Sequence, residues 1–170
     1  QPEESTQEKI EDAAILVVSF GTSYNDSRDI TNGAVEEAIA KAFPEYEVRR
    51  AFTAQIIIDK LAERDNLEID NVTQALDRAV ADGIKTLIVQ PTHLMNGLEY
   101  ADLAKELEGY KSDFDKVALG EPLLTSDGDY EAVVSAITNA TKEFDQGDET
   151  AIVFMGHGTE AESNQIYSTM

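Results

Sequence analysis

The sequence of 170 residues contains no cysteine. This absence excludes disulfide bonds, thiolate zinc sites and cysteine nucleophiles, so any metal site must use nitrogen or oxygen ligands. Basic residues are also few, since 13 lysines and arginines stand against 34 aspartates and glutamates, for a formal net charge of -21. A surface of that sign repels phosphate backbones and anionic lipid headgroups, and we therefore expect no nucleic-acid partner.

Long apolar runs are missing as well. The longest apolar stretches are strand-sized, such as residues 13–18, whereas ~18–20 residues are needed to span a bilayer. The sequence therefore predicts no membrane span. A hydrophobic fraction of 42% over 170 residues is enough for one good core, because single domains usually contain ~100–200 residues.

Apolar segments rich in β-branched residues alternate with longer segments of helical period. The strand-like segments are residues 14–20, 47–52, 86–89, 116–119 and 151–155, and the helical segments are residues 30–43, 54–64, 72–82, 99–110 and 130–144. This alternation is typical of βαβ units and predicts an α/β fold with an open parallel sheet flanked by helices. Asn96 with Glu99, and Thr159 with Glu162, have the spacing of capping boxes at helix starts.

An internal repeat indicates how the chain is divided. ILVVSFGTSYNDS at 15–27 resembles IVFMGHGTEAESN at 152–164, and each is an apolar strand that ends in Gly-Thr before a polar helix entrance. We therefore predict a flexible leader at 1–12, a first α/β domain at 13–125, and a linking helix with the start of a second, similar domain at 126–170. The leader begins without methionine, which leaves an extracytoplasmic location open.

Only two histidines occur, and each follows a strand-like segment directly. Ligands of open α/β sheets bind beyond the carboxyl ends of the strands. His157 has glycine on both sides, which leaves its imidazole uncrowded, and an exposed imidazole can bind a divalent ion or accept a proton at neutral pH. The alternative is that His157 only turns the chain. For His93 we expect an ordinary loop role, and we leave it out of the catalytic set.

Glu99 falls in the first turn of a predicted helix, where the helix dipole already favours a carboxylate. A capping role is therefore the alternative to a catalytic one, which requires Glu99 to face the same cleft as His157. The strand-end loops also predict substrate contacts for Ser19, Gly21, Thr22, Ser23, Tyr24 and Gly156. The Gly21–Tyr24 turn lacks the further glycines and lysine of nucleotide-binding loops, so nucleotide binding is a weak interpretation.

Five motifs occur in a fixed order: VVSFGTSYNDS, RAFTAQIIIDKL, QPTHLMNGLEY, GEPLLTS and VFMGHGT. In this order they resemble the anaerobic-type sirohydrochlorin cobaltochelatases of the class II chelatase superfamily. The resemblance implies two similar α/β domains with the tetrapyrrole between them. It also implies ATP-independent insertion of Co2+ into sirohydrochlorin for cobalamin biosynthesis, with no organic cofactor. We expect the chain to be incomplete for activity, because a further glutamate and histidine of that family have no counterpart here.

The resemblance implies that His157 binds the incoming metal and helps to remove pyrrole protons, and that Glu99 is an active-site acid. It leaves the choice among Co2+, Ni2+ and Fe2+ open, and it implies a cytoplasmic location. Arg28, Arg49 and Arg50 are candidates to bind the eight carboxylates of the substrate. Two alternatives remain at this stage: a tetrapyrrole or metal carrier without chelatase activity, and an inactive domain whose exposed sheet edge associates with its missing half or with a second copy.

Overall fold

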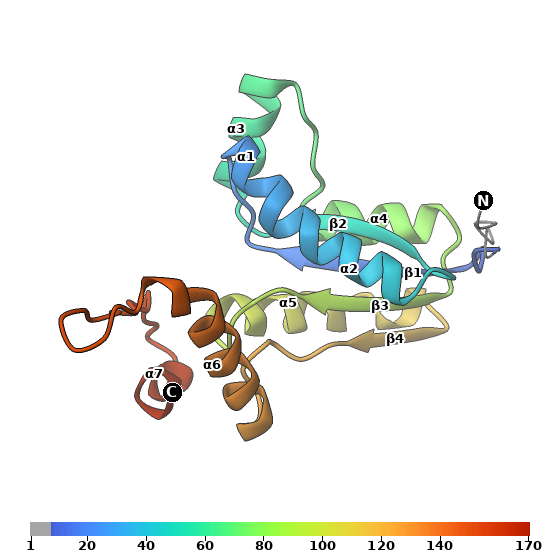
Figure 1. Cartoon of the computed structure of the whole chain (residues 1–170). Helices are drawn as coiled ribbons and strands as arrows, with labels where there is room; N and C mark the ends of the chain where they lie inside the picture. Colours follow the sequence, from blue (N-terminus) through green and yellow to red (C-terminus); the bar gives the residue numbers. More distant parts are fainter. Residues whose placement is uncertain (1–7) are drawn as a thin grey trace, which may run out of the picture.

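The computed structural model describes residues 8–170 and contains one four-stranded sheet (Figure 1). The strands are β1 (Ala13–Ser19), β2 (Glu47–Phe52), β3 (Thr86–Pro91) and β4 (Lys116–Leu119). All of them are parallel, in the order β2-β1-β3-β4. The prediction of an α/β fold with a parallel sheet is therefore confirmed.

The register of the sheet decides where the loops meet. Ser19 at the end of β1 pairs with Phe52 at the end of β2, and Val18 pairs with Pro91 at the end of β3. All seven residues of β1 are buried, as expected for a parallel strand with neighbours on both sides. The loops that follow β1, β2 and β3 consequently leave the sheet at the same edge.

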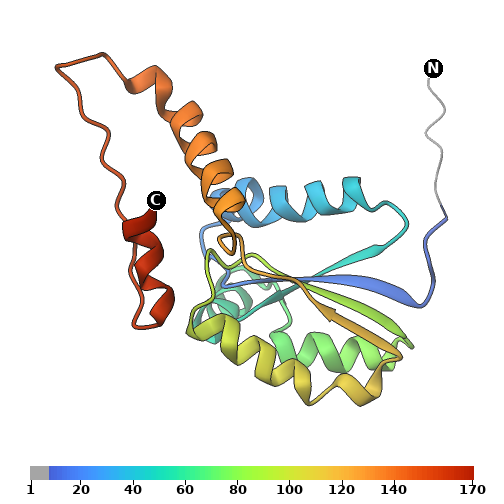
Figure 2. The ribbon, with the colours of Figure 1, turned by 90° about the horizontal axis from the view of Figure 1, so that it is seen from below.

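Helices cover the two faces of the sheet unequally. Figure 2 shows α2 on one face and α4 and α5 on the opposite face. The main core lies on the α4 and α5 side, where Leu76, Leu103 and Leu107 pack against the strands, whereas α2 contributes no buried residue. The α-helices are α1 (Asn25–Arg28), α2 (Ala34–Ala42), α3 (Gln55–Asp65), α4 (Val72–Ala81), α5 (Leu98–Glu108), α6 (Asp127–Thr141) and α7 (Ile166–Thr169). One π-helical turn (Asp29–Gly33) and three 3-10 turns (Lys111–Asp113, Lys142–Phe144 and Glu162–Gln165) join them.

Both predicted capping boxes are wrong. Helix α5 begins one residue later than the box at Asn96 requires, because Gly97 is the N-cap residue. The Thr159 hydroxyl accepts a hydrogen bond from the backbone N–H of Ala161 at 3.2 Å, so it closes a local turn and no reciprocal box forms with Glu162. Complete boxes stand at the starts of α4 and α6, where Asn71 and Ser126 are the N-cap residues.

The predicted fifth strand at 151–155 does not form. This segment has no regular secondary structure, and Val153 and Met155 are 85% and 95% exposed. A strand needs a neighbour to satisfy its backbone N–H and C=O groups, and among residues 8–170 no segment pairs with this one. Helix α6, which precedes it, has no buried residue and stands away from the sheet in Figure 2. The division into a first domain and the start of a second stays a prediction.

The predicted leader extends to residue 12, and residues 1–7 lie outside the described part of the chain. The backbone N–H of Ile10 donates to the carbonyl of Glu45 at 2.8 Å, and that of Lys85 donates to the carbonyl of Asp12 at 2.8 Å. The chain is therefore hydrogen-bonded to the domain from residue 10 onward. Within residues 8–170, no helix has both the length and the apolar character that crossing a membrane requires.

Candidate active site

Hydrogen bonds at Ser19 connect the end of β1 to the loop after β3. The Thr92 hydroxyl donates to Ser19 Oγ at 2.8 Å, and the Thr92 backbone N–H donates to the Val18 carbonyl at 2.9 Å. Ser19 is only 1% exposed, so its hydroxyl is not accessible to a ligand. Substrate contact by Ser19 stays a prediction that this burial does not favour, and the side chain links the β1 and β3 loops through its hydrogen bond to Thr92.

The loop after β3 is also anchored to the loop after β4. The carbonyl of His93 accepts a hydrogen bond from the backbone N–H of Leu123 at 3.0 Å, and the carbonyl of Leu94 accepts one from Leu124 at 2.8 Å. These bonds satisfy backbone carbonyls that would otherwise need water. The backbone that carries His93 is thus fixed before it enters α5.

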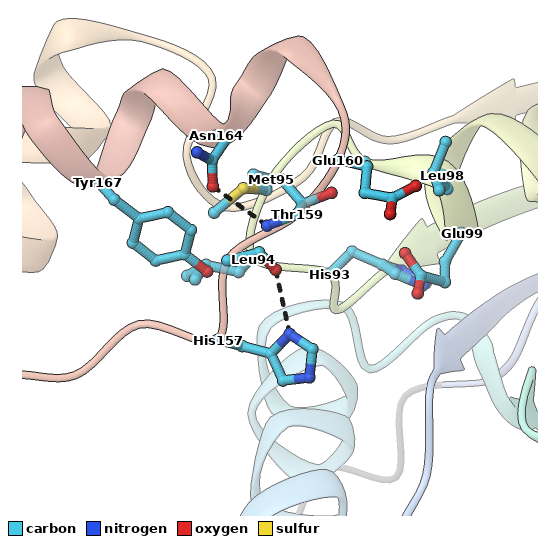
Figure 3. A pocket seen from close by; sticks show the side chains of 12 residues that line it. His93, Leu94, Met95, Leu98, Glu99, His157, Thr159, Glu160, Asn164 and Tyr167 are labelled. Carbon is cyan, nitrogen blue, oxygen red and sulfur yellow. Dashed lines mark hydrogen bonds between the residues drawn. The ribbon is translucent and has the colours of Figure 1, made fainter.

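A cavity of about 610 Å³ opens between this loop and the loop after residue 156 (Figure 3). Its volume lies in the ~300–1,000 Å³ range of small-molecule sites. It brings together His157 and Glu99, the two side chains that the sequence predicts to be catalytic. The lining residues are His93, Leu94, Met95, Gly97, Leu98, Glu99, His157, Gly158, Thr159, Glu160, Asn164 and Tyr167.

His157 is exposed, and its ring has a defined hydrogen bond. Nδ1 lies 3.0 Å from the carbonyl oxygen of Gly158. A carbonyl oxygen only accepts hydrogen bonds, so Nδ1 carries the proton in the neutral ring, and Nε2 keeps its lone pair. This bond holds the ring in the tautomer whose Nε2 is suited to a metal ion or a proton.

Glu99 is exposed in the first turn of α5 and lies close to the loop that carries His157. A methyl group added at Gly97 would lie 3.6 Å from Glu99 Oε2 and 3.8 Å from Thr159 Oγ1. The carboxylate and the 157–160 loop therefore approach each other over Gly97. The absence of a side chain at residue 97 leaves this space open.

His93 is the residue of the cavity whose importance sequence reasoning missed. Neither of its ring nitrogens is accessible to water, and neither has a hydrogen-bond partner among residues 8–170. Burial lowers the pKa of His93, and the nearby Glu99 carboxylate partly opposes this by raising it. The His93 ring is therefore held in its neutral form, in the same cavity as the Glu99 carboxylate. The only sequence signal was the position of His93 on the same strand-end loop as Glu99.

A complete metal site is not assembled in the part of the chain that the structure describes. Within residues 8–170, no group of three histidine, aspartate or glutamate side chains converges closely enough to hold a metal ion. Enclosed metal sites normally use three or four protein ligands. A metal-binding role for His157 stays a prediction, and its imidazole and the Glu99 carboxylate both line the cavity.

With this geometry in view, comparison with known proteins identifies the family. Residues 13–170 match the family described as cobalt chelatase (CbiK). The chain belongs to the cobalt chelatase (CbiK) family. It is 36% identical over 157 residues to the sirohydrochlorin cobaltochelatase of Salmonella typhimurium, and 32% identical over 158 residues to the sirohydrochlorin cobaltochelatase CbiKC of Nitratidesulfovibrio vulgaris. The family resemblance found in the sequence is confirmed.

The two alignments cover 92% of this chain but only 59% and 55% of the respective relatives. The chain therefore spans a little over half the length of the curated proteins that it matches. Activity, substrate and partners of the whole protein are for this reason treated as proposals below.

The turn after β1 lies outside the cavity lining. Gly21 has a φ of +97°, and Tyr24 is 75% exposed. Neither Thr22 nor Ser23 is among the residues that line the cavity. Gly156 is not among them either, although the ring of Tyr167 packs against its backbone so closely that a methyl group there would lie 2.2 Å from Cε1. Direct substrate contact by these residues stays a prediction.

Two of the three arginines expected to bind substrate carboxylates are already paired. Arg49 forms ion pairs with Glu47 at 3.0 Å and Asp82 at 2.8 Å. Arg50 donates to both carboxylate oxygens of Glu36, at 2.7 and 2.6 Å. Arg28 is 9% exposed, and its Nη1 donates to Asn25 Oδ1 at 2.8 Å. The guanidinium groups of all three arginines therefore already make contacts within the domain.

Proposed function

We propose that the full-length protein inserts Co2+ into sirohydrochlorin without ATP, as a step of cobalamin biosynthesis. The observation that carries this proposal is the single cavity lined by both His157 and Glu99. Membership of the cobalt chelatase family and the printed names of both relatives support the same reaction.

The reaction exchanges one divalent cation for two protons. Co2+ enters the ring, two pyrrole N–H bonds break, and two protons leave. His157 Nε2 replaces a water molecule on the incoming Co2+, because its lone pair is not used by the bond to Gly158. Glu99 accepts protons from the ring and, being exposed, returns them to solvent. No nucleotide is consumed if binding of the macrocycle supplies the distortion that exposes its nitrogens.

The cavity has walls suited to a flat ring. Leu94 and Leu98 are 42% and 55% exposed, and Tyr167 is 36% exposed. Apolar and aromatic surfaces of this kind are buried when a macrocycle packs against them, which favours binding. These side chains stand on both sides of the cavity, from the α5 loop and from α7.

The side chains that line the cavity carry negative charge, which favours binding of a divalent cation and disfavours binding of the substrate carboxylates. Glu99 and Glu160 line it, and no lysine or arginine does. Negative charge concentrates divalent cations and repels carboxylates. We therefore expect the macrocycle edge, not its carboxylate chains, to enter this cavity, and the rate of metal uptake to fall as ionic strength rises.

The test is a visible-absorption assay of the full-length protein with sirohydrochlorin and Co2+. The wild-type protein should give the spectral change of metal insertion faster than the uncatalysed reaction. His157→Ala and Glu99→Gln should each slow it by about 100-fold or more. Glu160→Gln removes negative charge from the same cavity but no proposed catalytic group, and it should slow the reaction much less. No rate above the uncatalysed one rejects the chelatase, and tight tetrapyrrole binding without insertion would favour the carrier.

A further inference from the structure

His93 is half-buried, and the surroundings of its ring nitrogens are unusual. Both ring nitrogens are inaccessible to water and have no hydrogen-bond partner in the described part of the chain. Buried polar groups are nearly always hydrogen-bonded, because an unpaired one costs free energy. Because the unpaired imidazole of His93 borders the candidate active site, we expect it to form a hydrogen bond with another group of that site.

Glu99 is the acidic residue best placed to be that partner. It lines the same cavity, and its negative charge raises the pKa of His93 against the effect of burial. Glu160 lines the cavity too and is the acidic control for this pairing. In Figure 3 the side chains of His93 and Glu99 are drawn one over the other, to the right of His157.

The two side chains differ in their freedom to move. The backbone of His93 is held by the hydrogen bond from Leu123, and its ring nitrogens are enclosed. Glu99 is exposed and makes no side-chain hydrogen bond or ion pair within residues 8–170. An exposed side chain of this kind changes rotamer within nanoseconds. Rotation of Glu99 toward a fixed His93 is therefore the movement that brings the pair together.

We propose that His93 is the positioning residue of Glu99: one ring N–H of the neutral imidazole donates to the Glu99 carboxylate and fixes its orientation in the cavity. The bond joins an ionised acceptor to a neutral donor and is of the stronger, charge-assisted kind. It satisfies one nitrogen of His93 and holds the carboxylate where it can receive a pyrrole proton. The catalytic part of this inference rests on the proposed function, whereas the pairing itself does not.

The pairing is measured by histidine-selective ¹⁵N NMR of the chain itself. Two histidines give two sets of ring signals, and His157→Ala assigns them. At about pH 8, where the lowered pKa of His93 keeps its ring neutral, the wild-type chain should show one His93 tautomer with a ring N–H that exchanges slowly with water. Glu99→Ala should mix the tautomers and abolish the slow exchange, whereas Glu160→Ala should leave both unchanged. His93 signals that are the same in wild type and Glu99→Ala overturn the proposal.

The catalytic part is measured by steady-state kinetics of the full-length protein. His93→Leu should lower kcat by about tenfold, the size expected for loss of a group that orients an active-site ligand, with KM little changed. His93→Gln keeps an N–H donor and should recover most of kcat. Equal losses in both variants would reduce His93 to a packing residue and overturn its positioning role. If the NMR pairing is present while Glu99→Gln retains full activity, the proposed function of Glu99 fails and the pairing stands.

Discussion

Replacing Gly21 with alanine tests whether the turn after β1 is shaped by its contact with the core. Gly21 has a φ of +97°, and a Cβ there would lie 2.5 Å from Cδ2 and 2.7 Å from Cγ of Phe52. Phe52 is fully buried and belongs to the cluster of Ile58, Leu61 and Ile69, so its ring cannot withdraw into solvent. The added methyl group must therefore displace either the turn or the core.

Two costs add in this variant. A positive φ costs a non-glycine residue about 1–2 kcal/mol, and forcing a methyl group into a packed core costs about 1–3 kcal/mol. We expect Gly21→Ala to lose about 2–5 kcal/mol of unfolding free energy. Gly83→Ala is the matched control, because Gly83 has a φ of +77° and no atom within 4 Å of the added Cβ. Gly83→Ala should therefore lose only the free energy that the positive φ costs a non-glycine residue.

Urea unfolding followed by circular dichroism measures both variants. The Gly21→Ala chain should be less stable than the Gly83→Ala chain by at least about 1 kcal/mol. Equal stabilities would show that the Phe52 ring does not confine the turn, and the account of this loop would then be wrong.

Three further predictions use the same chain. Ser19→Ala removes the acceptor of the Thr92 hydroxyl and should cost about 1 kcal/mol; a loss equal to zero would contradict the link between the loops. The Tyr110 hydroxyl donates a hydrogen bond to Asp77 at 2.6 Å, which raises the pKa of Tyr110 from 10.0 to about 12. The stabilisation that this hydrogen bond gives to the fold is therefore complete below pH 10 and is lost as pH rises through 12. Asp77→Asn should move the absorbance change of one tyrosine ionisation to lower pH. Val153→Thr should change the unfolding free energy by less than about 0.5 kcal/mol, because Val153 is 85% exposed, and a larger loss would indicate that the 151–155 segment is packed.

The four strands of the sheet were predictable because local patterns agreed with the tertiary structure. The apolar run that ends at Ser19 is buried along its whole length in β1, and each of the next three strands pairs with a neighbour. The segment at 151–155 has the same composition but no partner among the described residues, and it forms no strand. Strand propensity depends on pairing, which sequence alone does not contain.

The candidate site was predictable in part. Gly-flanked His157 and strand-end Glu99 were found from their positions, because parallel strands bring their following loops to one edge. The burial of Ser19 and the enclosed nitrogens of His93 were not predictable, since both depend on neighbours far away in the sequence. Ser19 meets Thr92 across 73 positions. Contacts of this kind decide whether a polar loop residue faces a ligand or supports the fold.

The central claim is that the cavity shared by His157 and Glu99 receives the divalent metal. Titration of the ¹⁵N-labelled chain with Co2+ tests it directly, because the paramagnetic ion broadens signals of the nuclei nearest to it. The ring signals of His157 should broaden first, and Glu99→Ala should weaken the effect. Broadening that begins at the acidic segment 145–149, with the His157 ring unaffected, would contradict the claim.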